Sequence, residues 1–305
     1  LFYKNYLLSS PMTLKEINNI KNNREVINLY DQYAHGKITK REFLDKVQKF
    51  IIGISAVAVL EVLSPKYSYA NQVDPNDKAL QITSVTYSSA KGHGAIKSYV
   101  VKPIKSNEKT PVILLVHENR GLNPYIMDVA RRIAKENFIA FAPDGLSAKG
   151  GYPGNDDQGR ELQASLDQEK LKQDFFAGIE YLEKNYKSKI GVIGFCYGGG
   201  MVNQLAVNFK NISAAVSYYG PQADLKDVPK IQSPLMLHYA ELDERINKGR
   251  PDFEKALKDN KKNYVIHDYK GVNHAFHNDT TPRYDKAAAE LSWKRSMDFF
   301  RIYLA

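Results

Sequence analysis

The sequence predicts an α/β fold in which helices flank a mostly parallel sheet, preceded by a separate helical extension. From residue 80 onward, short apolar runs alternate with longer helical patterns, which is typical of such sheets. Runs such as "PVILLVH" and "KIGVIGF" are continuously apolar, as expected of strands buried on both faces. A chain of 305 residues with 43% hydrophobic residues can form one large domain plus an appendage.

The expected elements of the main domain follow one another in a regular order. "ITSVTYSS" and "IKSYVVKP", on either side of "KGHG", predict an opening antiparallel pair of strands. The glycine- and aspartate-rich segment 144–162 is expected to be a long loop that faces the substrate. Further strands are expected at 111–117, 138–144, 189–195, 212–220, 233–241 and 263–269, and helices at 123–137, 169–186, 197–209, 250–260 and 284–304.

Residues 1–75 are predicted to form a helical extension or signal-like segment, and residues 76–305 the main domain. The run 50–63 is apolar except for Ser55 and Glu61, but it is too short for a transmembrane helix. "SPKYSYA" resembles a cleavage site, and "ITKREFL" resembles a twin-arginine signal in which Lys40 replaces the first arginine. Two interpretations stay open: an export signal leading to the periplasm, or a retained helical arm in a cytoplasmic protein, which we prefer.

The positive charge of the chain is mild and spread over both parts. Of the formal net charge of +9, residues 1–70 carry +4 and residues 71–305 carry +5, without blocks of like charge or interleaved aromatic residues. This pattern indicates a solvated surface and predicts no nucleic-acid partner. Contact of residues 50–63 with a membrane, and a monomeric or homo-oligomeric state, are left open.

The stretch "GFCYGGG" contains the only cysteine of the chain, Cys196, between a predicted strand and a predicted helix. Its first five residues match the nucleophile elbow G-x-S-x-G, with Cys in place of Ser. Glycines are needed there because the nucleophile takes a strained backbone conformation. The following helix directs its N-terminus at the sulfur, which favours thiolate, and Tyr197 would donate its backbone N–H to an oxyanion. The alternatives are a buried packing cysteine and a phosphate-binding turn, although the order G-x-G-x-x-G is absent.

An elbow requires an acid and then a histidine, each just after a later strand. Asp243 follows "SPLMLHYA", and His274 follows "NYVIHDY", so both stand in the required order. We therefore expect Cys196 to attack, His274 to transfer the proton and activate water, and Asp243 to hold the imidazole in the correct tautomer.

Each partner has competitors nearby. Glu241 and Glu244 compete with Asp243, whose offset from the strand end is the better one, and His277 competes with His274. We expect His277 to support the site or contact the substrate. We expect His238 and His267 in the core, and Tyr218 and Tyr219 at most in the pocket wall.

From Gln81 to the C-terminus the chain resembles the dienelactone hydrolase family of the α/β-hydrolase fold. The resemblance rests on "HENRGLNPYI", "APDGL", "GFCYGGG", "AELDERI" and "GVNHAFHN", in that order. It implies a hydrolase that needs no cofactor or metal and acts on a small ester or lactone. It also implies that Glu118 lies close to the nucleophile, reorients on substrate binding and helps to generate the thiolate. Asn119, in the same loop, would supply the second oxyanion N–H.

The chain departs from the family pattern at one substrate contact. Founding members bind the carboxylate of the lactone with two arginines, the second of which lies four residues after the catalytic histidine. Asn278 occupies that place here, which puts dienelactone itself in doubt as a substrate. Arg160 is a candidate for the first arginine, although a solvated arginine is an equal alternative. The expected substrate contacts are therefore Arg160, Tyr152, His277 and Asn278.

These residues predict a hydrolase of carboxylic esters or lactones that uses a Cys nucleophile. Thiolate is a good leaving group, so substrates with stabilised leaving groups, such as enol or aryl esters and strained lactones, are favoured over simple amides. The alternative is a hydrolase-fold scaffold with little catalysis, whose N-terminal arm serves assembly or membrane anchoring. A redox role is disfavoured because no resolving cysteine is present.

Overall fold

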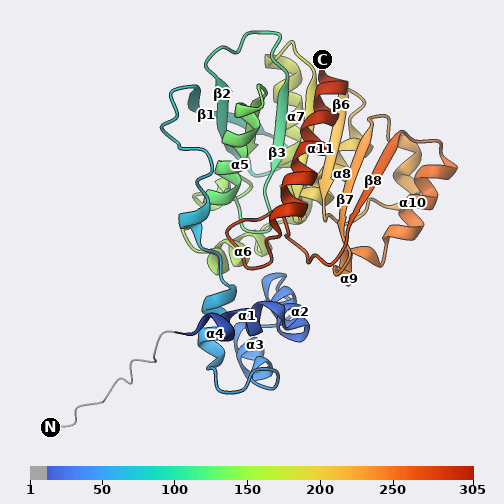
Figure 1. Cartoon of the computed structure of the whole chain (residues 1–305). Helices are drawn as coiled ribbons and strands as arrows, with labels where there is room; N and C mark the ends of the chain where they lie inside the picture. Colours follow the sequence, from blue (N-terminus) through green and yellow to red (C-terminus); the bar gives the residue numbers. More distant parts are fainter. Residues whose placement is uncertain (1–11) are drawn as a thin grey trace. The chain divides into compact units, whose positions relative to one another are not determined.

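In a computed structural model, residues 12–305 are described, and they form two compact units that divide between Pro65 and Lys66 (Figure 1). Each unit is described by itself. Residues 1–11 of the predicted extension lie outside the described residues. The short segment after Pro65 belongs to the second unit, where the Lys66 N–H donates to the Thr280 carbonyl (2.7 Å) and the Val73 N–H to Asp128 (3.0 Å).

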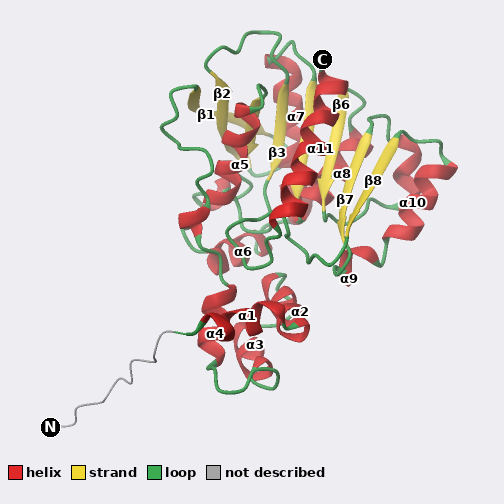
Figure 2. Cartoon of the chain, in the orientation of Figure 1, coloured by secondary structure: helices red, strands yellow, loops and turns green. Residues whose placement is uncertain are grey.

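The described part of the N-terminal unit consists of short helices (Figure 2), and a side chain caps the start of each. Thr13 and Thr39 each form a capping box, with Glu16 and Glu42 as the respective third helical residues. These caps begin separate helices where the sequence alone indicated one helical extension. The helices are α1 (Leu14–Asn22), α2 (Arg24–Ala34), α3 (Lys40–Val47) and α4 (Ala56–Leu63).

The apolar run 50–63 ends in helix α4. Ser55 caps this helix by accepting a hydrogen bond from the Ala58 N–H (3.2 Å), and Val59 and Leu63 are fully buried in the core of the N-terminal unit. Much of the apolar character of the run is thus used in packing, although Ile52 is 95% exposed. Among the helices of residues 12–305, none combines the length and apolar character needed to cross a membrane.

The second unit is built on an eight-stranded sheet with the order β1-β2-β4-β3-β5-β6-β7-β8. The pairs β1/β2 and β2/β4 are antiparallel and all other pairs are parallel, which confirms the predicted α/β fold and its opening antiparallel pair. The strands are β1 (Leu80–Ser89), β2 (Gly94–Pro103), β3 (Val112–Val116), β4 (Ile139–Pro143), β5 (Ile190–Phe195), β6 (Ile212–Tyr218), β7 (Leu235–Ala240) and β8 (Tyr264–Tyr269).

Helices cover both faces of this sheet. Leu114 joins one buried cluster and Leu115 the other, because successive side chains of a strand point to opposite faces. Helices α7, α8 and α10 pack on the first cluster, and α5 and α11 pack on the second. The helices are α5 (Pro124–Lys135), α6 (Asp156–Ala164), α7 (Gln168–Asn185), α8 (Tyr197–Asn208), α9 (Glu244–Asn247), α10 (Arg250–Asp259) and α11 (Lys286–Leu304).

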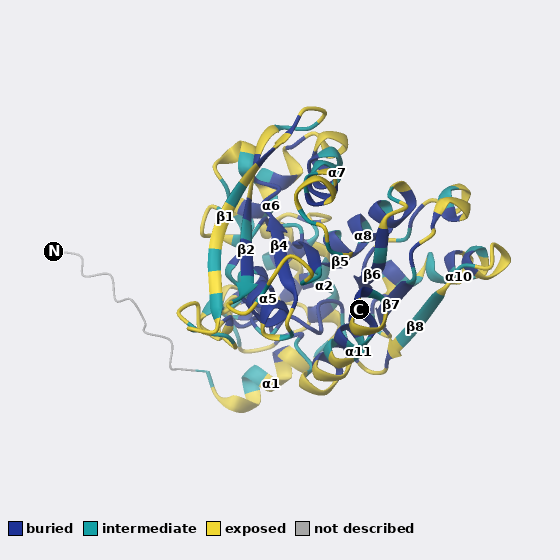
Figure 3. Cartoon of the chain, turned by 90° about the horizontal axis from the view of Figure 1, so that it is seen from above, coloured by how far each residue is buried: buried dark blue, intermediate teal, exposed yellow. Residues whose placement is uncertain are grey.

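Two local expectations differ from the structure. The segment 144–162 was expected to be a loop, but its residues from Asp156 onward lie in helix α6. Asn155 caps this helix by accepting a hydrogen bond from the Gln158 N–H (3.0 Å). His267 was expected in the core, but it is only half-buried, because β8 is an outer strand of the sheet. Figure 3 shows β1 and β8 with exposed and half-exposed residues and the strands between them mostly buried. His238, on β7, is buried as expected.

Candidate active site

Cys196 occupies the sharp turn between β5 and α8. Its backbone has φ 57° and ψ −115°, an unfavourable region for a residue with a side chain. A Cβ on Gly194 would lie 2.1 Å from the Gly198 carbonyl oxygen, and one on Gly198 would lie 2.3 Å from the Val116 carbonyl oxygen. Both glycines are thus required by close backbone approach, and the turn places the cysteine at the N-terminus of α8.

Asp243 and His274 come together from two loops at the carboxyl ends of β7 and β8. The Asp243 Oδ2 atom lies 2.5 Å from the Nδ1 atom of His274. The other carboxylate oxygen caps α9 by accepting from the Ile246 N–H (3.2 Å), which fixes the carboxylate plane. A ring nitrogen of His274 lies within 4.8 Å of the Cys196 sulfur. The structure therefore brings all three residues of the expected triad into one buried site.

The surroundings of His274 favour its charged form. Burial alone would lower the pKa of His274, but Asp243 and Cys196 beside the ring together raise it above the ordinary value. The ring of Tyr219 packs on His274 with centroids 4.9 Å apart, and Tyr219 is fully buried. This contact confines the imidazole, as expected of a pocket wall.

Glu118 lies just after β3 and is buried (4% exposed). The Asn278 side-chain amide donates to Glu118 Oε2 (3.1 Å), while Asn278 Oδ1 accepts from the Thr280 N–H (3.1 Å). Burial raises the pKa of Glu118, and the positive charges of Arg120 and Arg283 oppose that shift. Asn278 was expected to contact substrate; in the structure its amide contacts this carboxylate.

His117 is a site residue that the sequence analysis did not single out. Its Nε2 atom accepts a hydrogen bond from the Gly145 N–H (2.9 Å), so the ring proton sits on Nδ1, 2.6 Å from the Glu118 carbonyl oxygen. A trans peptide is planar, so this bond also fixes the direction of the Asn119 N–H, on the opposite side of the same peptide unit. Burial lowers the pKa of His117, which keeps the ring neutral. Its position next to Glu118 in "VHEN" was the available signal.

Two buried arginines were also missed. Arg120 and Arg283 are 6% and 5% exposed, and both lie near enough to Glu118 to affect its pKa. Arg120 pairs with Asp156 of α6 (Nη1 to Oδ2, 3.3 Å), and the Tyr152 hydroxyl donates to the same carboxylate (2.9 Å). Tyr152, an expected substrate contact, is thus part of the support of Arg120.

The two other expected contacts, Arg160 and His277, each lie close to a group of the protein itself. Arg160 lies on α6, 3.6 Å from Asp157, and the Nδ1 atom of His277 lies 2.7 Å from the Tyr125 hydroxyl.

Tyr197 is the first residue of α8, whose first N–H groups have no partner within the helix. Within residues 66–305, no three His, Cys or carboxylate side chains converge closely enough to hold a metal ion.

Two family models match the chain. The "YqhI-like" model matches residues 22–49, within the N-terminal unit. The model of the dienelactone hydrolase family matches residues 96–304, which is more than half of the chain and contains every residue of the expected catalytic set.

Individual proteins agree with the second match. "Protein usf" of Aquifex pyrophilus is 32% identical over 222 residues, covering 68% of this chain and 94% of that protein. A Bradyrhizobium protein named "Probable 2-oxo-3-(5-oxofuran-2-ylidene)propanoate lactonase" is 27% identical over 224 residues, covering 68% and 89%. The structure of the dienelactone hydrolase-like promiscuous phosphotriesterase P91 from metagenomic libraries shares the fold, with a TM-score of 0.65, 19% identity and coverage of 74% and 100%. The chain therefore belongs to the dienelactone hydrolase family, which confirms the predicted family, its α/β-hydrolase fold and its class as a hydrolase.

Proposed function

We propose that the chain hydrolyses carboxylic esters or lactones through an acyl-thiol intermediate on Cys196. The observation that carries the proposal is the buried juxtaposition of three groups. Cys196 sits in a strained turn at a helix N-terminus, within 4.8 Å of His274, which in turn lies 2.5 Å from Asp243. This is the arrangement that an activated nucleophile, its base and an orienting acid require.

In the first step, the thiolate of Cys196 attacks the carbonyl carbon of the bound ester. Glu118 accepts the thiol proton when the substrate enters, and because burial raises its pKa it is a stronger base than an ordinary carboxylate. The oxygen of the tetrahedral adduct accepts hydrogen bonds from the backbone N–H groups of Tyr197 and Asn119. Protonated His274 then donates its proton to the departing alkoxide, which leaves as the alcohol and yields the thioester.

In the second step, water hydrolyses the thioester. Neutral His274 removes a proton from the water as its oxygen attacks the acyl carbon, and Asp243 stabilises the imidazolium that forms. The adduct collapses with loss of Cys196 as thiolate, which leaves more readily than hydroxide. Glu118 then returns to the thiolate the proton that it took in the first step, which restores the starting enzyme and leaves the free acid as product.

The choice of cysteine as nucleophile also limits which esters can be hydrolysed. In the first adduct the thiolate competes with the alkoxide as leaving group, so productive substrates carry a stabilised alkoxide: an enol, a phenol or the ring oxygen of a strained lactone. The name of the Bradyrhizobium relative, a lactonase, supports a lactone substrate. Simple alkyl esters and amides are expected to react slowly.

The test uses the fact that Cys196 is the only cysteine. We expect p-nitrophenyl acetate to acylate the enzyme once. The acetyl adduct is detected by intact mass spectrometry after an acid quench, and treatment with hydroxylamine is expected to remove it. Cys196→Ala is expected to lower kcat by a factor on the order of 10³ or more and to abolish the adduct. Wild-type turnover by Cys196→Ala, with an unchanged melting temperature, would refute the mechanism.

A substrate screen then separates the ester classes. Enol lactones, phenyl acetate, ethyl acetate and acetanilide are compared at matched concentration, with Cys196→Ser as the control. We expect activity on the first two and little on the last two. Equal rates on ethyl and phenyl acetate would contradict the leaving-group argument while leaving the nucleophile intact.

A further inference from the structure

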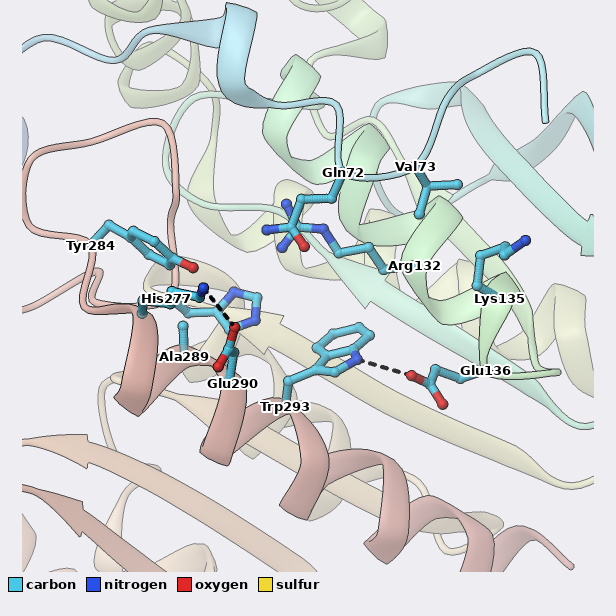
Figure 4. A pocket seen from close by; sticks show the side chains of 11 residues that line it. Gln72, Val73, Arg132, Lys135, Glu136, His277, Tyr284, Ala289, Glu290 and Trp293 are labelled. Atoms are coloured by element: carbon cyan, nitrogen blue, oxygen red, sulfur yellow. Dashed lines mark hydrogen bonds and ion pairs between the residues drawn. The ribbon is translucent and has the colours of Figure 1, made fainter.

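A cavity of about 410 Å³ opens between α5 and α11 in the second unit, away from the triad: neither Cys196 nor His274 lines it. Figure 4 shows Arg132 of α5 facing Trp293 of α11 across this space, with Tyr284 at one end and Lys135 at the other. Its volume lies within the range of small-molecule sites.

The buried wall of the cavity presents an unused polar atom. His277 lines the cavity, although its side chain is only 2% exposed. Its Nδ1 atom is engaged by the Tyr125 hydroxyl (2.7 Å), and among residues 12–305 no group hydrogen-bonds its Nε2 atom. Burial lowers the pKa of His277 well below its ordinary value, so the ring is neutral. The ring nitrogen of a buried, neutral histidine at a cavity wall is suited to one hydrogen bond with a ligand.

The rest of the wall combines aromatic rings with charges that are already paired. The rings of His277 and Trp293 lie 5.6 Å apart at 32°, and Tyr284 adds a third ring. Planar aromatic surfaces of this kind bind planar ligands by stacking.

The charged side chains of the wall each have a partner within the protein. Arg132 is bonded to Asp128 (2.7 Å) and Asp279 (2.6 Å), and Lys135 to Asp77 (2.8 Å). Lys286 lies 3.7 Å from Glu290, and Glu136 accepts a bond from the Trp293 indole (3.4 Å). A charged ligand would have to break one of these pairs, whereas an uncharged ligand would not.

We infer that this cavity is a second binding site, which takes a small, uncharged, planar molecule bearing one hydroxyl group, of the phenol class. The ring stacks against Trp293, and the hydroxyl forms its hydrogen bond with His277 Nε2. The site does not depend on the proposed hydrolysis.

The experiment uses Trp293 as its reporter, because it is the only tryptophan of the chain. Phenol is titrated into the full chain with excitation at about 295 nm, and calorimetry measures the same binding without the fluorophore. We expect a saturable change with a Kd on the order of 1 mM. Cyclohexanol, which is not planar, and benzoate, which is charged, are each expected to bind at least tenfold more weakly.

Matched variants on α11 locate the site. Ala289 is buried and lines the cavity, so Ala289→Leu fills it and is expected to weaken phenol binding at least tenfold. Ala287 is exposed and does not line it, so Ala287→Leu on the same helix is expected to leave the Kd unchanged. His277→Phe keeps the ring but removes the nitrogen, and is also expected to weaken binding.

The Cys196→Ala variant separates this site from the triad and from the outcome of the hydrolysis tests. We expect its affinity for phenol to equal that of the wild-type chain. The inference is overturned by the absence of saturable binding up to about 20 mM, by an unchanged Kd in Ala289→Leu, or by loss of binding in Cys196→Ala, which would assign the phenol to the active site.

Discussion

The Nδ1 atom of His117 donates to the carbonyl oxygen of Glu118 across 2.6 Å, because the Gly145 N–H occupies the other ring nitrogen. The bond orients the peptide unit between Glu118 and Asn119. That unit belongs to the loop that carries both the expected base and one of the proposed oxyanion donors. His117 is therefore placed to act as a positioning residue, without contact with the substrate.

His117→Phe tests this role. The phenyl ring can keep the packing against Phe175, whose ring centroid lies 5.5 Å from that of His117, while the hydrogen bond to Glu118 is lost. We expect kcat for p-nitrophenyl acetate to fall by about 10- to 100-fold, less than loss of an oxyanion donor costs, with KM changed less than threefold. A melting curve checks the fold. An unchanged kcat in a folded variant would remove His117 from the mechanism.

Asn278→Asp alters the charge beside Glu118. A second carboxylate next to Oε2 raises the pKa of Glu118 further, since two like charges disfavour ionisation. Because the base must be ionised to accept the thiol proton, the acid limb of the kcat/KM profile is expected to move to higher pH. We expect roughly tenfold lower kcat/KM near pH 6 and a smaller loss at pH 9. Asn278→Ala, which adds no charge, is the control; identical profiles for both variants would contradict the electrostatic argument.

Glu118→Gln is expected to lose activity and to gain stability. Burial raises the pKa of Glu118 in the folded chain above its unfolded value, so the fold binds the proton more tightly and the ionised carboxylate costs stability at high pH. We expect the variant to be more stable than wild type by about 0.5–2 kcal/mol at pH 8. The gain should shrink as pH falls through the folded pKa toward 4.5. Urea unfolding at pH 8 and pH 5 measures it, and a variant that is less stable at pH 8 would contradict the sign.

Gly198→Ala tests the packing of the elbow. The new Cβ would lie 2.3 Å from the Val116 carbonyl oxygen, a backbone atom in the centre of the sheet that cannot move aside cheaply. We expect a loss of about 3 kcal/mol or more in the free energy of unfolding, together with loss of activity. Gly200→Ala is the matched comparison, because its Cβ would meet the Pro221 ring at 2.9 Å, a longer contact than that of Gly198 and one with a side chain rather than with the backbone. Equal losses in the free energy of unfolding for the two variants would show that the backbone contact at Gly198 is no more restrictive than the contact at Gly200.

Part of the site could be predicted because the fold imposes an order on the chain. The elbow pattern predicts Cys196 as the nucleophile. Parallel strands carry their carboxyl ends to one edge, so Asp243 and His274, which follow β7 and β8, are the expected partners. Apolar runs also predicted the strands, since residues buried on both faces leave little polar sequence.

The rest depended on contacts between segments far apart in sequence. Asn278 stands where an arginine was expected from the family pattern, and its amide donates to a carboxylate 160 residues away. Arg283 lies in a loop with no motif, yet folding buries it where its charge affects Glu118.

The sequence by itself determined the family and the order of the strands along the chain, and it predicted the catalytic set, because these follow from local patterns of apolar residues, glycines and motif spacing. The tertiary structure alone decided in which direction the pKa of Glu118 shifts, which group holds its carboxylate, and that a cavity beside His277 exists. Burial and charge pairing depend on which distant side chains meet, and no local pattern encodes that meeting.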